Sequence, residues 1–445
     1  MSLPELPTWH DYNPVTGEGE PVTPLSAAQL NAFAEAIKAR IAAAVAATSP
    51  DSGAVLYNAT EANLARWRSA FAAASGGGAA ARISVSGGST PQGLGSGTDY
   101  LLSSWPKRMQ AMMEARCGRG GTGMVIPWES FTTGRPENMP VWNFVGTIEN
   151  RPRGVYSLGG KRIAADSGAS YIEFGPVWCD TFRVMCIGSP GSVAAVRVDG
   201  VSAGTIRAET STGSATATLP LKTGYATGVG VGQGQAVTDV PAGSLGWHTL
   251  RISSQANTVT VASVEGLVPG GVAVSNLGRG GTSSDDLVQD DAAVGMYGLS
   301  VAFDASRADL HIIQMVTNDF REHTPLATYK AAILTAVARQ RATSPVANGG
   351  TPAAGDVLLI AGQPINLGLH PPDGIQVPSW EAYTDVLREV SDEQSVPLLV
   401  LDDLFVDFPT GDARGWYTDS LHPSALGAEV IASTVTQALT RAVVS

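Results

Sequence analysis

The chain has 445 residues, of which 44% are hydrophobic and 15% are charged. This length suggests about three domains, and the apolar share is ample for packed cores. The 40 acidic and 28 basic residues give a formal net charge of −12, which argues against a nucleic-acid-binding protein. No apolar run approaches about 18 residues, so we expect no transmembrane helix. Three cysteines are too few and too scattered for a disulfide framework or a zinc site. The first residues lack the pattern of a secretory signal peptide.

Residues 1–50 form a separate opening segment. After an irregular stretch, Ser26 is a favourable N-cap for a helix. Apolar side chains then recur every three or four residues, at Leu30, Phe33, Ile37, Ile41 and Ala44. This spacing gives one narrow stripe, which is typical of a coiled-coil seam. Since a lone helix of about 20 residues is marginal in water, the stripe must dock, either on the rest of its own chain or on copies of itself in a trimer.

Residues 54–124 and 272–445 together predict one discontinuous α/β domain. Five short apolar segments are typical of buried strands, at Arg82–Ser86, Val272–Ser275, Leu310–Val316, Val357–Ala361 and Val396–Leu401. Helical patterns accompany them, at Asn63–Ala74, Tyr100–Arg116, Pro325–Arg341, Trp380–Glu393 and Ser424–Val443. Such alternation predicts a mostly parallel sheet with helices on both faces.

Residues 125–271 interrupt this alternation and contain no convincing helix. Short strands separated by turn residues are expected at Ser170–Phe174, Phe182–Ile187, Val193–Val198, His248–Ser253 and Val259–Val264. This pattern predicts a β-sandwich, jelly-roll-like, inserted after the first strand of the α/β domain. Residues 200–204 (Gly-Val-Ser-Ala-Gly) fit a nucleophile-elbow pattern, but they lie between two short strands, which favours a hairpin turn.

Two blocks carry the groups needed for nucleophilic catalysis. Ser89 follows Gly87 and Gly88, and Gly93 comes four residues later, directly after the first strand of the α/β domain, where a hydroxyl is exposed and accessible. Asp419 precedes His422 by three residues near the end of the chain. In this arrangement the His takes the proton of a nucleophilic Ser, and the Asp fixes its tautomer. Each signal alone is weak, because Gly-Ser turns and helix-capping His residues are common.

Two further blocks follow predicted strands and carry hydrogen-bond donors. Residues 276–282 follow the second strand of the α/β domain and include Gly281, whose backbone N–H is unobstructed by a side chain. Asn318 follows the third strand and has a side-chain amide. Backbone N–H groups and amides are the donors that form an oxyanion hole.

In chain order, these four blocks resemble the SGNH (GDSL-type) hydrolase family. The resemblance implies a three-layer α/β/α fold with Ser89, Asp419 and His422 as the triad, and with Ser89, Gly281 and Asn318 as the oxyanion hole. Two residues depart from the family pattern, because Gly88 stands where Asp is usual and Val316 stands where Gly is usual. These departures leave open a catalytically degenerate scaffold that binds a receptor without hydrolysis.

Residues 23–31 (Thr-Pro-Leu-Ser-Ala-Ala-Gln-Leu-Asn) resemble the N-terminal attachment region of bacteriophage tail proteins. This second resemblance implies a virion location at the tail tip, other tail proteins as partners and a homotrimer. The sequence thus predicts a tail-associated serine esterase, without metal or cofactor, acting on an O-acyl ester of a host cell-surface glycan or lipid. A bacterial carbohydrate esterase with no phage role remains an alternative.

Four side chains are candidates for substrate binding outside the triad. Trp142, Trp178 and Trp247 of the insert could offer stacking surfaces for a glycan, although burial in a core is the default expectation for each. His370 follows the fourth strand of the α/β domain, on the side where the catalytic blocks are expected.

Overall fold

The computed structural model describes residues 56–60, 62–127, 133–136, 139–150, 161–164, 169–188, 191–207, 217–220, 234–288, 307–342, 356–369 and 378–444. The helix predicted within residues 1–50 lies outside this described part of the chain, and so does His370. No helix in the described ranges combines the length and apolarity needed to cross a membrane.

A five-stranded parallel sheet forms the centre of the α/β region. Its strands lie in the order β10 (Val272–Gly278), β1 (Ala81–Gly87), β11 (Leu310–Met315), β12 (Asp356–Ala361) and β13 (Leu398–Val400). The last residue of β1, Gly87, pairs with Gly278 of β10 and with Gln314 of β11. The carboxyl ends of β10, β1 and β11 therefore lie side by side, and the loops that follow these strands meet at one edge of the sheet.

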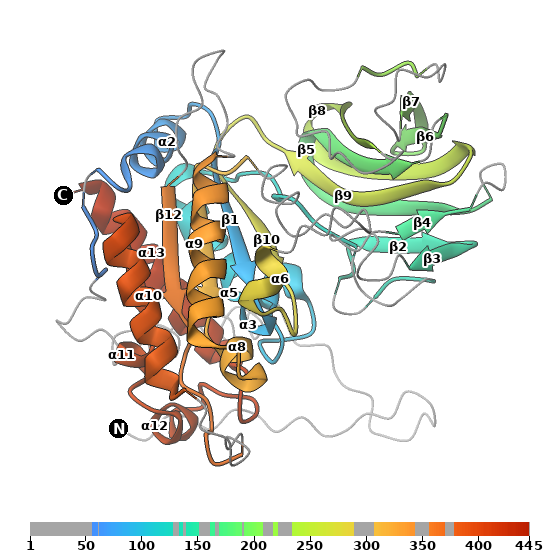
Figure 1. Cartoon of the computed structure of the whole chain (residues 1–445). Helices are drawn as coiled ribbons and strands as arrows, with labels where there is room; N and C mark the ends of the chain where they lie inside the picture. The colour runs from blue at the N-terminus through green and yellow to red at the C-terminus, as the bar shows by residue number, and fades with distance from the viewer. Residues whose placement is uncertain are drawn as a thin grey trace, which may run out of the picture. The chain divides into compact units, whose positions relative to one another are not determined.

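Helices cover both faces of this sheet (Figure 1). One face packs against α6 (Ser284–Val288), α9 (Leu326–Ala342) and α10 (Trp380–Gln394). The other packs against α2 (Ala65–Ser75), α5 (Trp105–Cys117) and α13 (Ala425–Val444). Alternate residues of β11 serve the two cores, since Leu310 and Ile312 face the second layer while Ile313 and Met315 face the first. The predicted three-layer α/β/α architecture is confirmed.

The helix predicted over 100–116 is broken into two pieces. Helix α4 (Tyr100–Ser103) ends at Ser104, whose ψ of 146° is extended, and α5 begins at Trp105. Pro106 explains the break, because its ring clashes with the preceding turn of a continuous helix but fits the first turn of a new one. The new start places the Trp105 indole N–H 2.9 Å from Oε1 of Gln314 at the end of β11.

The insert contains longer strands than predicted. The expected segments 170–174 and 182–187 belong to one strand, β5 (Tyr171–Gly188), and 248–253 belongs to β8 (Gly234–Ala256). Register shifts between β5 and β8 at Phe174/Val177 and Cys179/Thr181 bend the pair. Bulges allow a strand to pass from one layer of a sandwich to the other. The Gly175-Pro176 pair at this point resembles a loop signal in sequence, which is why the prediction divided the strand.

The strands of the insert form a single eight-stranded antiparallel sheet, and the bent pair β5–β8 belongs to both halves of it. In one, the first half of β5 pairs with β2 (Trp142–Val145) and the last part of β8 pairs with β6 (Val193–Val198), which continues into β7 (Val201–Arg207). In the other, the second half of β5 pairs with β9 (Val259–Leu267), which continues to β4 (Lys161–Ile163) and β3 (Ile148–Asn150). One hydrophobic core joins the two halves. Residues 200–204 begin the β6–β7 hairpin, as predicted.

Specific contacts join the insert to the α/β region. Thr122 exchanges backbone and side-chain hydrogen bonds with Gly266 of β9, and Val125 pairs with Val264. Arg82 of β1 makes a bidentate contact with Glu265, at 2.6 and 2.7 Å. These contacts on neighbouring residues of β9 hold that strand close to β1 and to the connection after α5.

Candidate active site

Ser89 lies at the first position of a short helix, α3 (Ser89–Gln92), which follows β1 after one residue, Gly88. This strand–turn–helix arrangement projects the hydroxyl beyond the carboxyl edge of the sheet. Ser89 is 8% exposed, so its hydroxyl is nearly enclosed by the neighbouring loops.

Asp419 and His422 share a tight loop before α13. Tyr417 pairs with Pro423 across its base, and Thr418 N donates to the His422 carbonyl at 3.0 Å. The Thr418 hydroxyl donates to the Gly95 carbonyl at 2.7 Å, which attaches this loop to the segment after Ser89. Gly95 has a φ of +81°, and a Cβ there would lie 2.8 Å from the His422 Cβ. A residue with a side chain at position 95 would therefore push the imidazole aside.

The structure brings Ser89, His422 and Asp419 into one hydrogen-bonded row. His422 Nε2 lies 2.9 Å from Ser89 Oγ, and His422 Nδ1 lies 2.8 Å from Asp419 Oδ2. The other Asp419 oxygen accepts from the backbone N–H groups of Leu421 and His422. Burial raises the pKa of Asp419, but these hydrogen bonds outweigh it and hold the pKa below its usual value. Asp419 is thus an anion that orients the imidazole.

Asn318 lies on the other side of Ser89. It is the second residue of α8 (Thr317–Glu322), which begins after β11, and its side-chain amide donates to the Thr282 carbonyl at 2.8 Å. Ser89, Thr282 and Asn318 line a cavity of about 20 Å³. The neighbouring Gly281 is exposed, and its backbone N–H has no partner among the described residues. The Asn318 amide thus lies beside the same cavity as Ser89, as a donor of an oxyanion hole requires. The glycine found close to Ser89 is Gly280, where a Cβ would lie 3.8 Å from the Ser89 Cβ.

The structure shows the surroundings of the two residues, Gly88 and Val316, that depart from the family pattern. A Cβ on Gly88 would lie 2.7 Å from the Asn318 amide nitrogen, so an Asp at this position would displace that amide. Val316, directly before α8, has φ +113° and ψ −55°, a conformation that is strained for a β-branched residue. Glycine would adopt it without strain, yet Val316 is fully buried in the core next to the site.

Two buried glutamines that the sequence reasoning missed tie the loops together. The Gln363 amide nitrogen lies 3.1 Å from the Thr90 hydroxyl and 3.1 Å from the Leu421 carbonyl. Gln314 contacts Gln363 on one side and accepts from Trp105 on the other. Gln363 is fully buried two residues beyond β12. A polar residue directly after a buried parallel strand was the signal that could have found it, because that edge of the sheet was already expected to hold the site.

The predicted tryptophans do not line the space beside Ser89. Trp142 is fully buried in the insert core, 4.8 Å from the Phe174 ring centroid, so the prediction that it stacks on substrate is wrong. Trp178 and Trp247 lie near Arg119. Arg119 pairs with Val272 at the start of β10, whereas Ser89 lies beyond the opposite end of the sheet. Neither Trp178 nor Trp247 therefore lines the cavity beside Ser89.

Comparison with known proteins agrees with this arrangement. Residues 252–430 match the family model described as GDSL-like Lipase/Acylhydrolase family. A solved peptidoglycan O-acetylesterase is 17% identical, with a TM-score of 0.59, over 85% of this chain and 96% of that one. The α/β region therefore has the fold of the SGNH hydrolases. No curated protein sequence matches the chain.

Two further solved structures match smaller parts of this chain. A Bacillus subtilis protein is 15% identical over 63% of this chain and 87% of its own, with a TM-score of 0.31. A family two carbohydrate esterase from Clostridium thermocellum is 12% identical over 67% and 98%, with a TM-score of 0.28.

The matched region of the hydrolase includes Gly281, Asn318, Asp419 and His422 but not Ser89. The insert explains this, because it separates β1 and the Ser89 turn from the remaining blocks by more than 150 positions of the printed sequence. Only the folded arrangement places the Ser89 hydroxyl against His422.

In the described residues, no three His, Cys, Asp or Glu side chains gather in a way that could hold a metal ion.

Proposed function

We propose that this protein is a serine esterase that removes an acetyl group from a cell-surface glycan or lipid. Ser89 Oγ attacks the ester carbonyl carbon as His422 Nε2 takes the hydroxyl proton, and Asp419 stabilises the resulting imidazolium. The oxyanion accepts hydrogen bonds from the Ser89 and Gly281 N–H groups and the Asn318 amide. The C–O bond of the ester then breaks, and the alcohol leaves with the proton from His422. Water hydrolyses the acyl-enzyme with His422 as base.

The observation that carries this proposal is the continuous row from Ser89 Oγ through His422 to Asp419, with separations of 2.9 and 2.8 Å. These distances are within the range expected for a nucleophile and its base. The alternative of a degenerate scaffold rests on Gly88 and Val316, and neither residue supplies a group to this row.

The size of the adjoining cavity supports a short acyl group. A volume of about 20 Å³ is close to the minimum of roughly 10–15 Å³ that holds one water molecule. A methyl group is of similar size, whereas a longer acyl chain would have to displace Met315 or Val316, both of which line the cavity and are buried. The proposal therefore predicts a steep loss of rate from p-nitrophenyl acetate to p-nitrophenyl butyrate.

The decisive experiment is hydrolysis of p-nitrophenyl acetate by the purified chain and by Ser89→Ala. We expect a loss on the order of 10⁴-fold or more, since the variant lacks the nucleophile. Ser69→Ala is the matched control, because Ser69 is exposed on α2 and lies among residues at the amino-terminal edge of the sheet. Equal rates for the wild type and Ser89→Ala would contradict the esterase and favour a receptor-binding scaffold.

The biological setting of the proposal is a phage tail tip. The attachment-like residues 23–31 and the apolar stripe from Leu30 to Ala44 support docking on other tail proteins and a homotrimer. Deacetylation of the host envelope would then aid adsorption or penetration. Light scattering tests the assembly, because Leu30→Asp with Ile37→Asp should convert a trimer to a monomer. A monomeric wild type would favour a bacterial carbohydrate esterase instead.

A further inference from the structure

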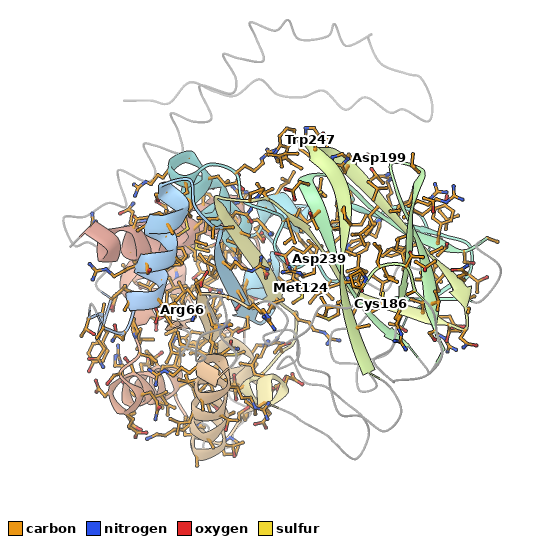
Figure 2. The ribbon with its side chains drawn as sticks, turned by 90° about the horizontal axis from the view of Figure 1, so that it is seen from above. Arg66, Met124, Cys186, Asp199, Asp239 and Trp247 are labelled. Atoms are coloured by element: carbon orange, nitrogen blue, oxygen red, sulfur yellow. The ribbon has the colours of Figure 1, made fainter. Side chains whose placement is uncertain are left out.

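A second hollow lies between helix α5 and the insert, separate from the triad. It has a volume of about 410 Å³, within the range of small-molecule sites. Two large apolar side chains remain exposed in its lining, namely Trp247 at 59% and Leu102 at 73%. Figure 2 shows Trp247 at the outer edge of the insert, in contrast to Cys186 among the strands. Exposed apolar side chains lining a concave site mark a binding surface.

The aromatic side chains of this hollow have a defined arrangement. The rings of Trp178 and Trp247 meet edge to face, with centroids 5.9 Å apart. The Arg119 guanidinium lies 5.2 Å from the Trp247 centroid and 5.9 Å from that of Trp178. These contacts orient the rings and hold the guanidinium in place. Within the described residues, the N–H groups of Arg119 meet no hydrogen-bond acceptor, so they can donate to a ligand.

Two carboxylates in the same lining supply acceptors. Asp99 uses Oδ1 to accept from Leu101 N at 2.9 Å, and Glu114 uses Oε1 to accept from Gln110 at 2.9 Å. The Asp99 carboxylate also accepts from the backbone N–H of Leu102, whereas the second oxygen of Glu114 has no partner in the part of the chain that the structure describes. The hollow therefore combines an apolar aromatic face with a fixed donor at one point and acceptors at two others.

We infer that this hollow, lined by Trp247, Trp178, Arg119, Asp99 and Glu114, binds the pyranose rings of a polysaccharide. A pyranose has an apolar C–H face that packs on an indole ring, and a rim of hydroxyl groups that both donate and accept hydrogen bonds. The Arg donor and the two carboxylate acceptors match that rim. A purely apolar partner would leave these charged groups desolvated and unpaired, which is costly.

The position of this hollow relative to Ser89 and His422 indicates how it would contribute to hydrolysis. This step rests on the proposed esterase activity. The segment that contacts His422 through Gly95 continues directly to Asp99 and Leu102. Arg119 lies at the other end of β10, which at about 3.3 Å per residue is about 20 Å long. A chain of several sugar rings can therefore contact both places at once. The second site would hold the polymer while one of its acetyl esters lies at Ser89.

Isothermal titration calorimetry on the full chain tests the site directly, with chitotetraose, tetra-N-acetylchitotetraose and cellotetraose as probes. We expect at least one probe to bind, and Trp247→Ala to weaken that binding about tenfold or more. Val201→Ala is the matched control, because Val201 is a 71% exposed apolar residue of the same insert that does not line the hollow. Trp247→Phe should retain part of the affinity, since it keeps an aromatic face.

Failure of this inference is distinguishable from failure of the esterase. If none of the probes binds the wild type, or if Trp247→Ala binds as tightly as the wild type, the saccharide site is overturned whatever the Ser89→Ala experiment gives. A change in molar mass on Trp247→Ala, without saccharide binding by the wild type, would assign the surface to protein contact and would likewise overturn it. If both activities exist, Trp247→Ala should lower the ratio of acetylated-polymer hydrolysis to p-nitrophenyl acetate hydrolysis.

Discussion

Each of the two regions of the molecule contains an Asp–His pair, and the pairs have almost the same geometry. In the α/β region, His422 Nδ1 lies 2.8 Å from Asp419 Oδ2. In the insert, His248 Nδ1 lies 2.7 Å from Asp199 Oδ2. They differ at the second ring nitrogen. His422 Nε2 faces the Ser89 hydroxyl, whereas His248 Nε2 faces the Ser244 backbone carbonyl.

This difference decides what each imidazole can do. A carbonyl oxygen only accepts hydrogen bonds, so His248 satisfies both neighbours by donating from both nitrogens, which requires the cation. The hydrogen bonds to Asp199 and Ser244 accordingly raise the pKa of His248. A hydroxyl can donate, so His422 Nε2 can accept the proton of Ser89. An Asp–His pair becomes a general base only where the third group can give up a proton.

The two regions also differ in where they hold unusual backbone conformations. Among described residues of the insert, the non-glycine residues with positive φ are Asp199 and Asn257, both of types that tolerate this region. At the carboxyl edge of the parallel sheet, the corresponding residues include Val316 and Val406, with φ +113° and +67°. Strain in β-branched residues is thus concentrated where the hydrolase site lies, a pattern associated with functional sites.

Replacement of the two aspartates tests the comparison most severely. We expect Asp419→Asn to lower kcat on p-nitrophenyl acetate by about 10³- to 10⁴-fold, because the amide favours the wrong tautomer of His422. Asp199→Asn is the matched control, since it makes the same change in an Asp–His pair that faces no hydroxyl. Comparable losses in the two variants would show that the pairs are not functionally distinct.

Restoring the family residue at position 88 gives the next largest effect. We expect Gly88→Asp to reduce kcat by about 10²-fold, since its Cβ would lie 2.7 Å from the Asn318 amide and remove one oxyanion donor. Gly88→Ala introduces the same Cβ without a carboxylate and should cause most of the loss. Wild-type or higher rates for Gly88→Asp would mean that Asn318 does not act on the oxyanion.

The sequence predicted the site better than it predicted the insert, for a physical reason. Parallel strands bring their carboxyl ends to one edge, so finding the Ser, Gly and Asn blocks after strands was enough to expect these three together. The Asp–His block follows α12 and not a strand, and the family resemblance joined it to the others. No comparable rule connects antiparallel segments. The bends that unite β5 across Gly175-Pro176 depend on pairing with β8, a strand more than 50 residues away in sequence.

The tryptophans show the same limit at the level of single side chains. Trp142 alternates with Phe144 on β2, and both are buried, so period-two spacing was a usable signal for a core position. Trp247 is exposed because β8 presents it beside Arg119, a residue from the connection after α5. That contact is between segments far apart in the chain and has no local signature. Gln363 was missed for a different reason: the sequence shows its position after β12 but not its three partners, Thr90, Leu421 and Gln314.

The strained backbone at Val316 should make the Gly variant at this position more stable than the Ala variant, which is the reverse of the usual order. At an ordinary buried site, Gly is less stable than Ala by roughly 0.5–1 kcal/mol. At φ +113° we expect Val316→Gly to be about 1 kcal/mol more stable than Val316→Ala in urea unfolding, because Gly alone is unstrained there. Val274, which is equally buried in β10, is the matched control and should give the ordinary order. The ordinary order at both positions would contradict strain.

The smallest expected effect is the pH dependence of the pair in the insert. Since the pKa of His248 is raised on folding, its pairing with Asp199 contributes fully below the unfolded pKa of about 6.5 and is lost as pH rises through the folded value. The Asp199 side chain is 48% exposed, so we expect a contribution below about 1 kcal/mol. The stability difference between the wild type and Asp199→Asn, measured by urea unfolding from pH 5.5 to 9, should therefore shrink with rising pH. Comparing the two proteins at each pH removes the contribution of the other titrating groups to stability. A difference that stays constant with pH would mean that His248 is not held as a cation.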